Sequence, residues 1–118
     1  MQAQKKLLVL LWQKPLEMEA LKMINLTQED LKRLPKLGAT DGQGMKAVAY
    51  VKFFAPGFWT WYVTEFDGED RFFGLVRGFE DEFGYFSLKE LRAVPGLGIE
   101  KDLYFNPAML EDCINKNL

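Results

Sequence analysis

The chain has 118 residues, of which 48% are hydrophobic and 27% are charged, a balance typical of one globular domain. It contains no histidine, which excludes Ser-His and Cys-His nucleophilic pairs, histidine acid–base catalysis and most zinc sites. The net charge of −2 is unevenly distributed: residues 1–36 carry 7 − 4 = +3, whereas residues 65–82 carry 2 − 7 = −5.

Residues 1–22 are predicted to form an N-terminal extension, and residues 23–118 a single domain. Leu7–Trp12 is an apolar run of six residues. Because about 18 apolar residues are needed to cross a bilayer, we expect a helix or an added strand that docks on the domain. Residues 16–22 contain good helix formers and are predicted to continue a short N-terminal helix.

A clearer helix is predicted after Thr27, whose hydroxyl stands three residues before the acid Asp30, in the pattern of an N-terminal cap. Pro35 is predicted to stop this helix. Gly38–Gly44 follows as a polar connector; it lacks the ending of a phosphate-binding loop, and we interpret it as a flexible loop.

The middle of the chain is predicted to be a four-stranded antiparallel meander spanning about residues 47–87. Four runs rich in Val, Thr and aromatic residues are separated by short turn segments, which force neighbouring strands to be antiparallel. The predicted strands are Ala47–Phe54, Phe58–Phe66, Arg71–Phe79 and Glu82–Ser87. The fold class is therefore predicted to be α+β, with short helices packed on the sheet at both ends of the chain.

Three further elements are predicted after the meander. Ser87 to Glu90 has the pattern of a capping box and should open a short helix that ends before Pro95. Asp102–Phe105 is a candidate short strand, and Asn106 is predicted to cap a C-terminal helix. The single cysteine, Cys113, would lie in that helix as a packed thiol; since it has no disulfide partner, we expect a reducing cytoplasm.

The aromatic residues of the meander are the first candidate functional group. Alternation along a strand places Trp59 and Trp61 on one face, and Phe58, Tyr62 and Phe66 on the other. We favour core packing on both faces, since aromatics dominate small cores. The alternative is an aromatic platform for a partner protein or for stacked bases. The set is Trp59, Trp61, Phe72, Phe73, Phe79, Tyr85 and Phe86.

The run Arg71–Phe79 shares four positions with the RNA-recognition signature, but two of the three stacking positions are lost. The neighbouring turns are also acidic and would repel phosphate. We therefore interpret the match as chance.

Acidic residues cluster in two turns, around residues 67–70 and 80–82. Successive turns of a meander lie at opposite ends of the sheet, which disfavours one metal site built from both turns. A cation site within residues 65–70 lacks the spacing of a calcium loop, and a solvated turn is the better interpretation. The remaining functional interpretation is an acidic surface that mimics nucleic-acid phosphate and occupies a basic groove on another protein.

Four distinctive runs stand out along the chain: Leu26–Leu37, Val51–Asp70, Phe72–Leu91 and Leu97–Phe105. Together they resemble a domain-of-unknown-function family of small proteins carried on plasmids, conjugative elements and phages. The resemblance covers about residues 24–108. It implies accessory work for mobile DNA, and one such class comprises anti-CRISPR inhibitors of Cas9-type nucleases. The family has no assigned catalytic residues that could be carried over.

Together these observations predict a non-enzymatic monomer in the bacterial cytoplasm, without a cofactor, that inhibits an RNA-guided nuclease by binding its positively charged channel. An alternative is a single-stranded nucleic-acid-binding protein that uses the aromatic sheet face and the basic N-terminus. A metal-dependent hydrolase is the weakest alternative, because the acids do not converge on a pocket. The predicted partner-binding residues are Trp59, Trp61, Asp67, Glu69, Asp70, Glu80, Asp81 and Glu82.

Overall fold

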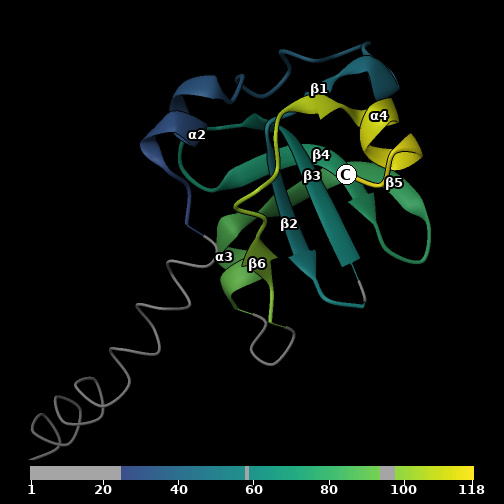
Figure 1. The fold of residues 1–118 in the computed structure, drawn as a ribbon. Helices are drawn as coiled ribbons and strands as arrows, with labels where there is room; N and C mark the ends of the chain where they lie inside the picture. The colour runs from purple at the N-terminus through teal and green to yellow at the C-terminus, as the bar shows by residue number, and fades with distance from the viewer. Residues whose placement is uncertain (1–24, 58, 94–97) are drawn as a thin grey trace, which may run out of the picture.

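The computed structural model describes residues 25–57, 59–93 and 98–118 (Figure 1). At its centre lies a five-stranded antiparallel sheet in the order β5-β4-β3-β2-β6. The predicted α+β class is confirmed, and β2 to β5 follow one another as a meander. The strands are β2 (Val51–Ala55), β3 (Trp59–Phe66), β4 (Arg71–Arg77), β5 (Asp81–Ser87) and β6 (Glu100–Lys101).

The first strand of the five-stranded sheet is shorter than predicted, because it begins at Val51 and not at Ala47. β1 (Val48–Ala49) pairs instead with β7 (Ala108–Met109) in a separate two-stranded sheet. The predicted strand Asp102–Phe105 is also wrong: β6 ends at Lys101, and a turn follows. Both features depend on contacts between distant parts of the chain, which local propensity does not encode.

The short helices begin largely where the capping signals placed them. Helix α2 (Gln28–Arg33) is capped by Thr27 and helix α3 (Leu88–Arg92) by Ser87, whose Oγ accepts a hydrogen bond from the Glu90 amide. A 3-10 turn, η1, covers Gly44–Lys46. Helix α4 (Leu110–Asn115) begins later than predicted, since β7 occupies the expected first turn.

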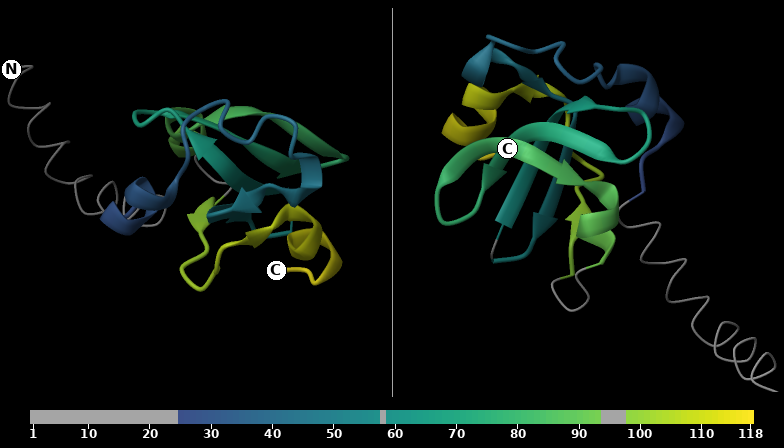
Figure 2. Two further views of the ribbon diagram at one scale, coloured as in Figure 1. Left: turned by 90° about the horizontal axis from the view of Figure 1, so that it is seen from above. Right: turned by 180° about the vertical axis from the view of Figure 1, so that it is seen from behind.

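Both faces of the sheet are covered, as the abundance of aromatic residues indicated. One face, here the α3 face, carries Phe53, Val63, Phe72 and Phe86, packed with Leu88 and Leu91 of α3. The opposite face, the α4 face, packs Tyr62 and Leu75 against Leu110 and Cys113 of α4. Figure 2, seen from above, shows α4 and β7 together on one side of the sheet.

A β-bulge at Thr64 changes which side chains share a face. Val63 pairs with Gly74 and Glu65 with Phe73, which leaves Thr64 as the extra residue. Phe66 therefore lies on the α3 face with Phe72, so the prediction that it shares a face with Tyr62 is wrong. Gly74 is required opposite the bulge, since a Cβ there would lie 1.8 Å from the Tyr62 carbonyl oxygen.

The predictions for Leu7–Trp12, for the helix over residues 16–22 and for Phe58 lie outside the described residues.

Candidate partner-binding surface

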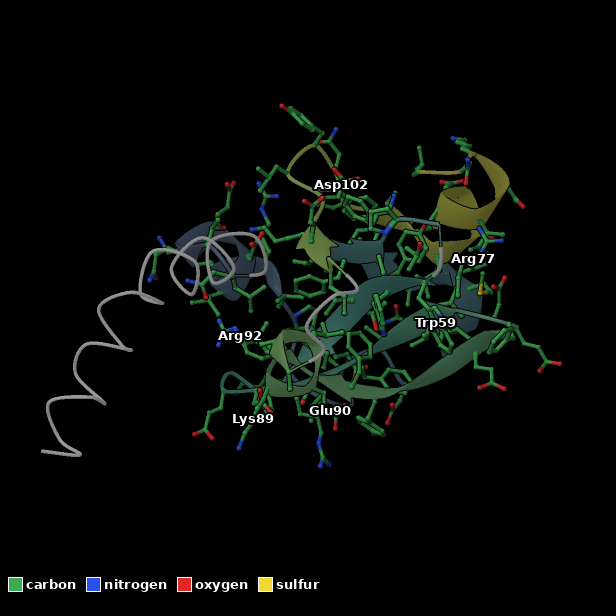
Figure 3. All side chains as sticks on the ribbon, turned by 90° about the horizontal axis from the view of Figure 1, so that it is seen from below. Trp59, Arg77, Lys89, Glu90, Arg92 and Asp102 are labelled. Carbon is green, nitrogen blue, oxygen red and sulfur yellow. The ribbon has the colours of Figure 1, made fainter. Side chains whose placement is uncertain are left out.

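The sheet separates the predicted partner-binding residues into two groups at opposite ends. At the Trp59 end, β2 and β4 finish and β3 and β5 begin; at the Asp67 end, β3 turns into β4. Figure 3 shows Trp59 and Arg77 well apart from Lys89 and Glu90, which follow the opposite end of β5. Asp67, Glu69 and Asp70 thus cannot form one surface with Glu80, Asp81 and Glu82.

At the Asp67 end, carboxylates build the turn itself. Oδ1 of Asp67 accepts hydrogen bonds from the amides of Glu69, Asp70 and Arg71, at 2.8, 2.8 and 3.0 Å. These amides hold the pKa of Asp67 below its ordinary value. Oδ1 of Asp70 accepts from the Lys89 amide at 2.8 Å, in the first turn of α3. Asp67 and Asp70, two of the three acids at this end, therefore stabilise the turn and the start of α3.

At the Trp59 end, the cross-strand register aligns aromatic and acidic side chains in two rows on the α3 face. One row runs from Trp61 through Val76 to Glu82, which are paired across β3, β4 and β5. The same register continues into a second row of Trp59, Gly78 and Glu80. We call Trp59, Trp61, Val76, Phe79, Glu80 and Glu82 the acidic–aromatic patch.

Trp59 is the centre of this patch. Its ring stacks on Trp61 at a centroid distance of 6.2 Å and meets Phe79 edge-on at 5.8 Å. A Cβ on residue 78 would lie 2.4 Å from the Trp59 ring, so Gly78 provides the flat floor on which the indole lies. Trp59 remains 37% exposed and Phe79 is 97% exposed. Two large aromatic surfaces are thus presented to solvent.

A cavity of about 230 Å³ is lined by Trp59, Val76, Phe79, Glu80 and Glu82. The two glutamates make no ion pair within the part of the chain that the structure describes. Asp81 differs, because it lies on the α4 face, where it pairs with Arg77 at 3.1 Å. The cavity therefore combines aromatic rings with two uncompensated negative charges, which is an environment for a cation.

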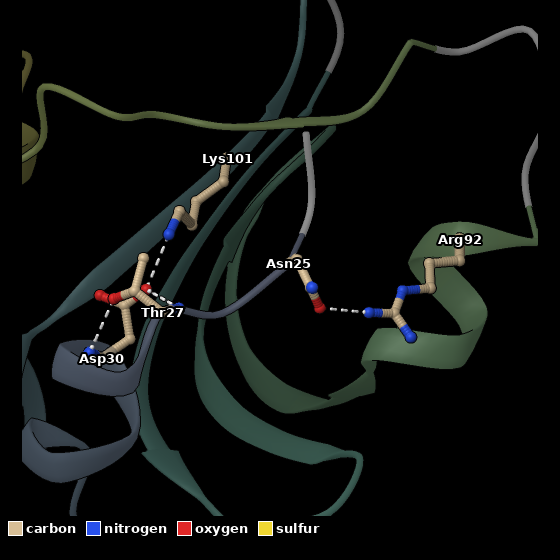
Figure 4. A network of polar contacts seen from close by, with 5 residues as sticks. All are labelled: Asn25, Thr27, Asp30, Arg92 and Lys101. Carbon is tan, nitrogen blue, oxygen red and sulfur yellow. Dashed lines mark hydrogen bonds and ion pairs between the residues drawn. The ribbon is translucent and has the colours of Figure 1, made fainter. Parts of the chain in front are cut away.

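A second cleft lies between α2 and the segment around β6, with a volume of about 290 Å³. Its charges are paired internally: Lys101 donates to Asp30 at 2.7 Å (Figure 4). In addition, Lys52 lies 3.5 Å from Asp102. Burial would raise the pKa of Asp30, but Lys101 and the Thr27 amide outweigh it and lower the pKa. This network joins α2 to β6 and leaves little net charge for a ligand.

Glu65, another acid of the predicted cluster, points into the protein and is 1% exposed. Its carboxylate accepts hydrogen bonds from the amides of Gly38 and Thr40, at 2.7 and 2.8 Å, and from the Thr40 hydroxyl. Burial would raise the pKa of Glu65, but these donors outweigh it and lower the pKa. The connector that we interpreted as a flexible loop is thus anchored on β3.

A family model described as "Protein of unknown function (DUF2958)" matches residues 25–111. The chain belongs to this family. The match confirms the resemblance to a domain-of-unknown-function family and covers the whole sheet, including the acidic–aromatic patch. No curated protein and no solved structure matches the chain.

In this DUF2958 chain, two members of the acidic–aromatic patch, Val76 and Phe79, are absent from the partner-binding residues that the sequence predicted. The strand pattern predicts that Phe79 ends a strand, whereas β4 ends at Arg77 and Phe79 lies in the exposed turn. A signal was present, because Gly78 interrupts the strand pattern next to an aromatic residue and three acids.

The remaining groups that could carry chemistry are the Cys113 thiol and the other acidic side chains. Cys113 is fully buried, and burial, with a contribution from Asp112, raises the pKa of its thiol to about 11. Over residues 25–57, 59–93 and 98–118, no group of three or more acidic or cysteine side chains is placed to hold a metal ion. No helix in that same part of the chain is long and apolar enough to cross a membrane.

Proposed function

We propose that this protein is a non-enzymatic accessory of mobile DNA that acts by binding another protein, and that the acidic–aromatic patch is its contact surface. The observation that supports this most is the pairing of exposed aromatic rings with glutamates that have no internal counter-charge in the described residues. Tryptophan is enriched at the energetic centres of protein interfaces, and exposed acids steer basic partners toward a surface.

The patch matches a basic side chain in both shape and charge. An arginine or lysine in the cavity would face the rings of Trp59 and Phe79 and the carboxylates of Glu80 and Glu82. Cation–π contact contributes about 0.5–2 kcal/mol, with the larger value reached when the site is desolvated. A protein groove lined with arginine and lysine is thus the class of partner that this surface favours.

The concrete partner that we propose is a Cas9-type RNA-guided nuclease in the cytoplasm of a bacterial host. Such enzymes hold nucleic acid in a positively charged channel, for which an acidic surface can compete. The resemblance to proteins of plasmids, conjugative elements and phages supports this setting by association. The protein would then act as an anti-CRISPR inhibitor that occupies the channel.

Binding to guide-loaded Cas9 at several salt concentrations tests this proposal. The variant Glu80→Gln/Asp81→Asn/Glu82→Gln should bind more weakly and show a flatter salt dependence, because screening acts on the charges removed. The matched control Glu69→Gln/Glu90→Gln/Glu111→Gln removes the same formal charge elsewhere. Equal binding by both triple variants and the wild type would remove the phosphate-mimic mechanism.

A second candidate function, binding of single-stranded nucleic acid, is favoured by a strip of aromatic side chains on the α4 face. Phe73 stacks on Phe83 at 6.1 Å and lies 5.0 Å from Tyr85, and Arg71 is positioned over the Tyr85 ring. Stacking on such rings contributes about 1–3 kcal/mol per base. Asp81, at the start of the same strand, opposes phosphate binding. A gel-shift with a labelled oligonucleotide at low salt, showing no retardation at high protein concentration, would exclude this function.

A further inference from the structure

Strand β5 forms one edge of the five-stranded sheet. Within the described residues its only strand neighbour is β4. The Leu88 amide donates to the Asp70 carbonyl, and the Gly78 amide donates to the Glu80 carbonyl. These two bonds show which residue pairs between β4 and β5 are hydrogen-bonded and which are not, because the two kinds of pair alternate along an antiparallel ladder. Glu82, Gly84 and Phe86 therefore bond to β4, whereas the backbone N–H and C=O groups of Phe83 and Tyr85 point away from it.

Apart from the acids Asp81 and Glu82 at its start, this edge lacks the devices that usually prevent strands from pairing. β5 is seven residues long and contains no proline and no lysine, and its pairing with β4 has no bulge. Two aromatic side chains stand on it, with Phe83 44% and Tyr85 63% exposed. Such a strand has unpaired backbone groups and unburied apolar area along the same line, which is the signature of a strand that accepts another strand.

The end of β5 leads directly into α3 (Figure 2, view from behind). A groove lies beside this second half of the strand. Its volume is about 550 Å³, and its lining includes Tyr85, Phe86 and Ser87 of the strand, with Arg71 and Lys89 next to them. Asp70 and Glu90 also line it, but the Asp70 carboxylate already accepts the Lys89 amide. The groove leaves room for an added strand whose acidic end would approach Arg71 and Lys89.

We propose that the occupant of this edge is β5 of a second copy, paired antiparallel about a two-fold axis at Gly84. In this register, Phe83 of each copy faces Tyr85 of the other. Both residues direct their free backbone groups outward, so each pair can exchange two hydrogen bonds. Gly84 faces Gly84 in a non-hydrogen-bonded pair, with Cα atoms about 4.5 Å apart.

The side chains of β5 are self-complementary in this register. On the α4 face, Leu75 and Phe83 are neighbours within one copy, and Phe83 then faces Tyr85 of the second copy, which is the neighbour of Phe73 there. This arrangement buries the exposed rings of Phe83 and Tyr85. Asp81 comes to lie opposite Ser87 of the second copy, beside its Arg71. On the α3 face, the close approach of the strands occurs at Gly84, where no side chain stands in the way. This proposed two-fold dimer differs from the monomer that we expected from the sequence.

A cysteine placed on the axis reports this register directly. The Cβ of Gly84→Cys would meet no atom within 4 Å in its own chain, and two such cysteines about 4.5 Å apart at Cα satisfy disulfide geometry. Under mild oxidation, most of the Gly84→Cys protein should become a disulfide-linked dimer. The matched control is Glu82→Cys, on the same face of the same strand, which faces Phe86 of the second copy and should remain unlinked.

Equal cross-linking of Gly84→Cys and Glu82→Cys, or none in either, would overturn the proposal. The native Cys113 does not interfere, because it is buried. Sedimentation of the wild-type chain should give twice the 13.7 kDa of one copy. A monomer up to high micromolar concentration would also overturn it. A third result would overturn it as well: a monomer in which the NMR signals of the Phe83 and Tyr85 amides respond only to a synthetic peptide of alternating valine and lysine. The edge would then bind a peptide partner and not a second copy.

A backbone variant separates strand pairing from side-chain contact. Tyr85→Pro removes an N–H that β4 does not use, and proline is tolerated on an edge strand. We expect Tyr85→Pro to be a folded monomer by sedimentation and circular dichroism, while Tyr85→Ala retains a measurable dimer. If Tyr85→Pro does not fold, Phe83→Lys serves instead, since it places two cations beside the axis. A dimer as tight as wild type in the folded variant contradicts strand pairing.

Discussion

Replacing Glu65 should destabilise the protein more than replacing any exposed acid, because the buried carboxylate holds three donors of the 38–40 connector. Glu65→Ala leaves these donors without an acceptor. A hydrogen bond to a charged group contributes about 1.5–3 kcal/mol, and partial rehydration recovers some of it, so we expect a loss of about 3–5 kcal/mol in the free energy of unfolding. At roughly 4 °C per kcal/mol, the melting temperature falls by about 12–20 °C.

Glu65→Gln is the finer test. The amide can keep its oxygen on the Thr40 side but places an NH₂ group against the Gly38 amide, so about 2 kcal/mol should be lost. Thermal and urea unfolding at pH 7 measure this, with the exposed Glu69→Gln as control. A Glu65→Gln protein as stable as the control at pH 7 would refute the assigned role.

The same carboxylate predicts a pH dependence. The folded-state pKa of Glu65 lies below its ordinary value of 4.5, so its contribution is fully present above pH 4.5 and is lost as the pH falls through the lowered pKa. The difference in stability between wild type and Glu65→Gln should therefore narrow below pH 4.5. A difference that stays constant down to the acid transition would contradict the hydrogen-bonded carboxylate.

Three further substitutions test other contacts. Gly78→Ala should displace the Trp59 ring, with a loss of about 1 kcal/mol and a change in tryptophan emission; an unchanged spectrum would contradict the packing. Asp67→Ala should speed amide exchange in the 67–71 turn while Asp67→Asn largely preserves protection, and equal exchange in both would argue against the side-chain acceptor. Lys101→Met should cost about 1–2 kcal/mol and raise the pKa of Asp30, followed by NMR titration of its carboxyl; an unmoved pKa would show that the ion pair is weak.

Local signals in the sequence were sufficient for much of the fold. Thr27 and Ser87 predict the starts of α2 and α3, because a capping hydroxyl acts within one helical turn. The turns between β3, β4 and β5 are equally local, so the meander follows from them. Trp59 and Trp61 share a face as predicted, since only one residue separates them and the bulge comes later in β3.

Features that depend on distant contacts were not predictable in the same way. The bulge at Thr64 exists together with Gly74 on the neighbouring strand, and it reverses the face of Phe66. Glu65 resembles an ordinary surface acid in sequence; its burial becomes visible only when the Gly38–Thr40 connector closes over it. The patch required the cross-strand register, because Phe79 and Trp59 are twenty residues apart in the chain.

The most direct test of the proposed function is an order-of-addition experiment in a Cas9–guide cleavage reaction, with the protein added either before or after the target DNA. Competition for the positively charged channel predicts inhibition only when the protein is added first, and a weaker effect of the Glu80→Gln/Asp81→Asn/Glu82→Gln variant. No inhibition in either order across several Cas9 orthologues would contradict the proposed partner, and equal inhibition in both orders would contradict competition with DNA.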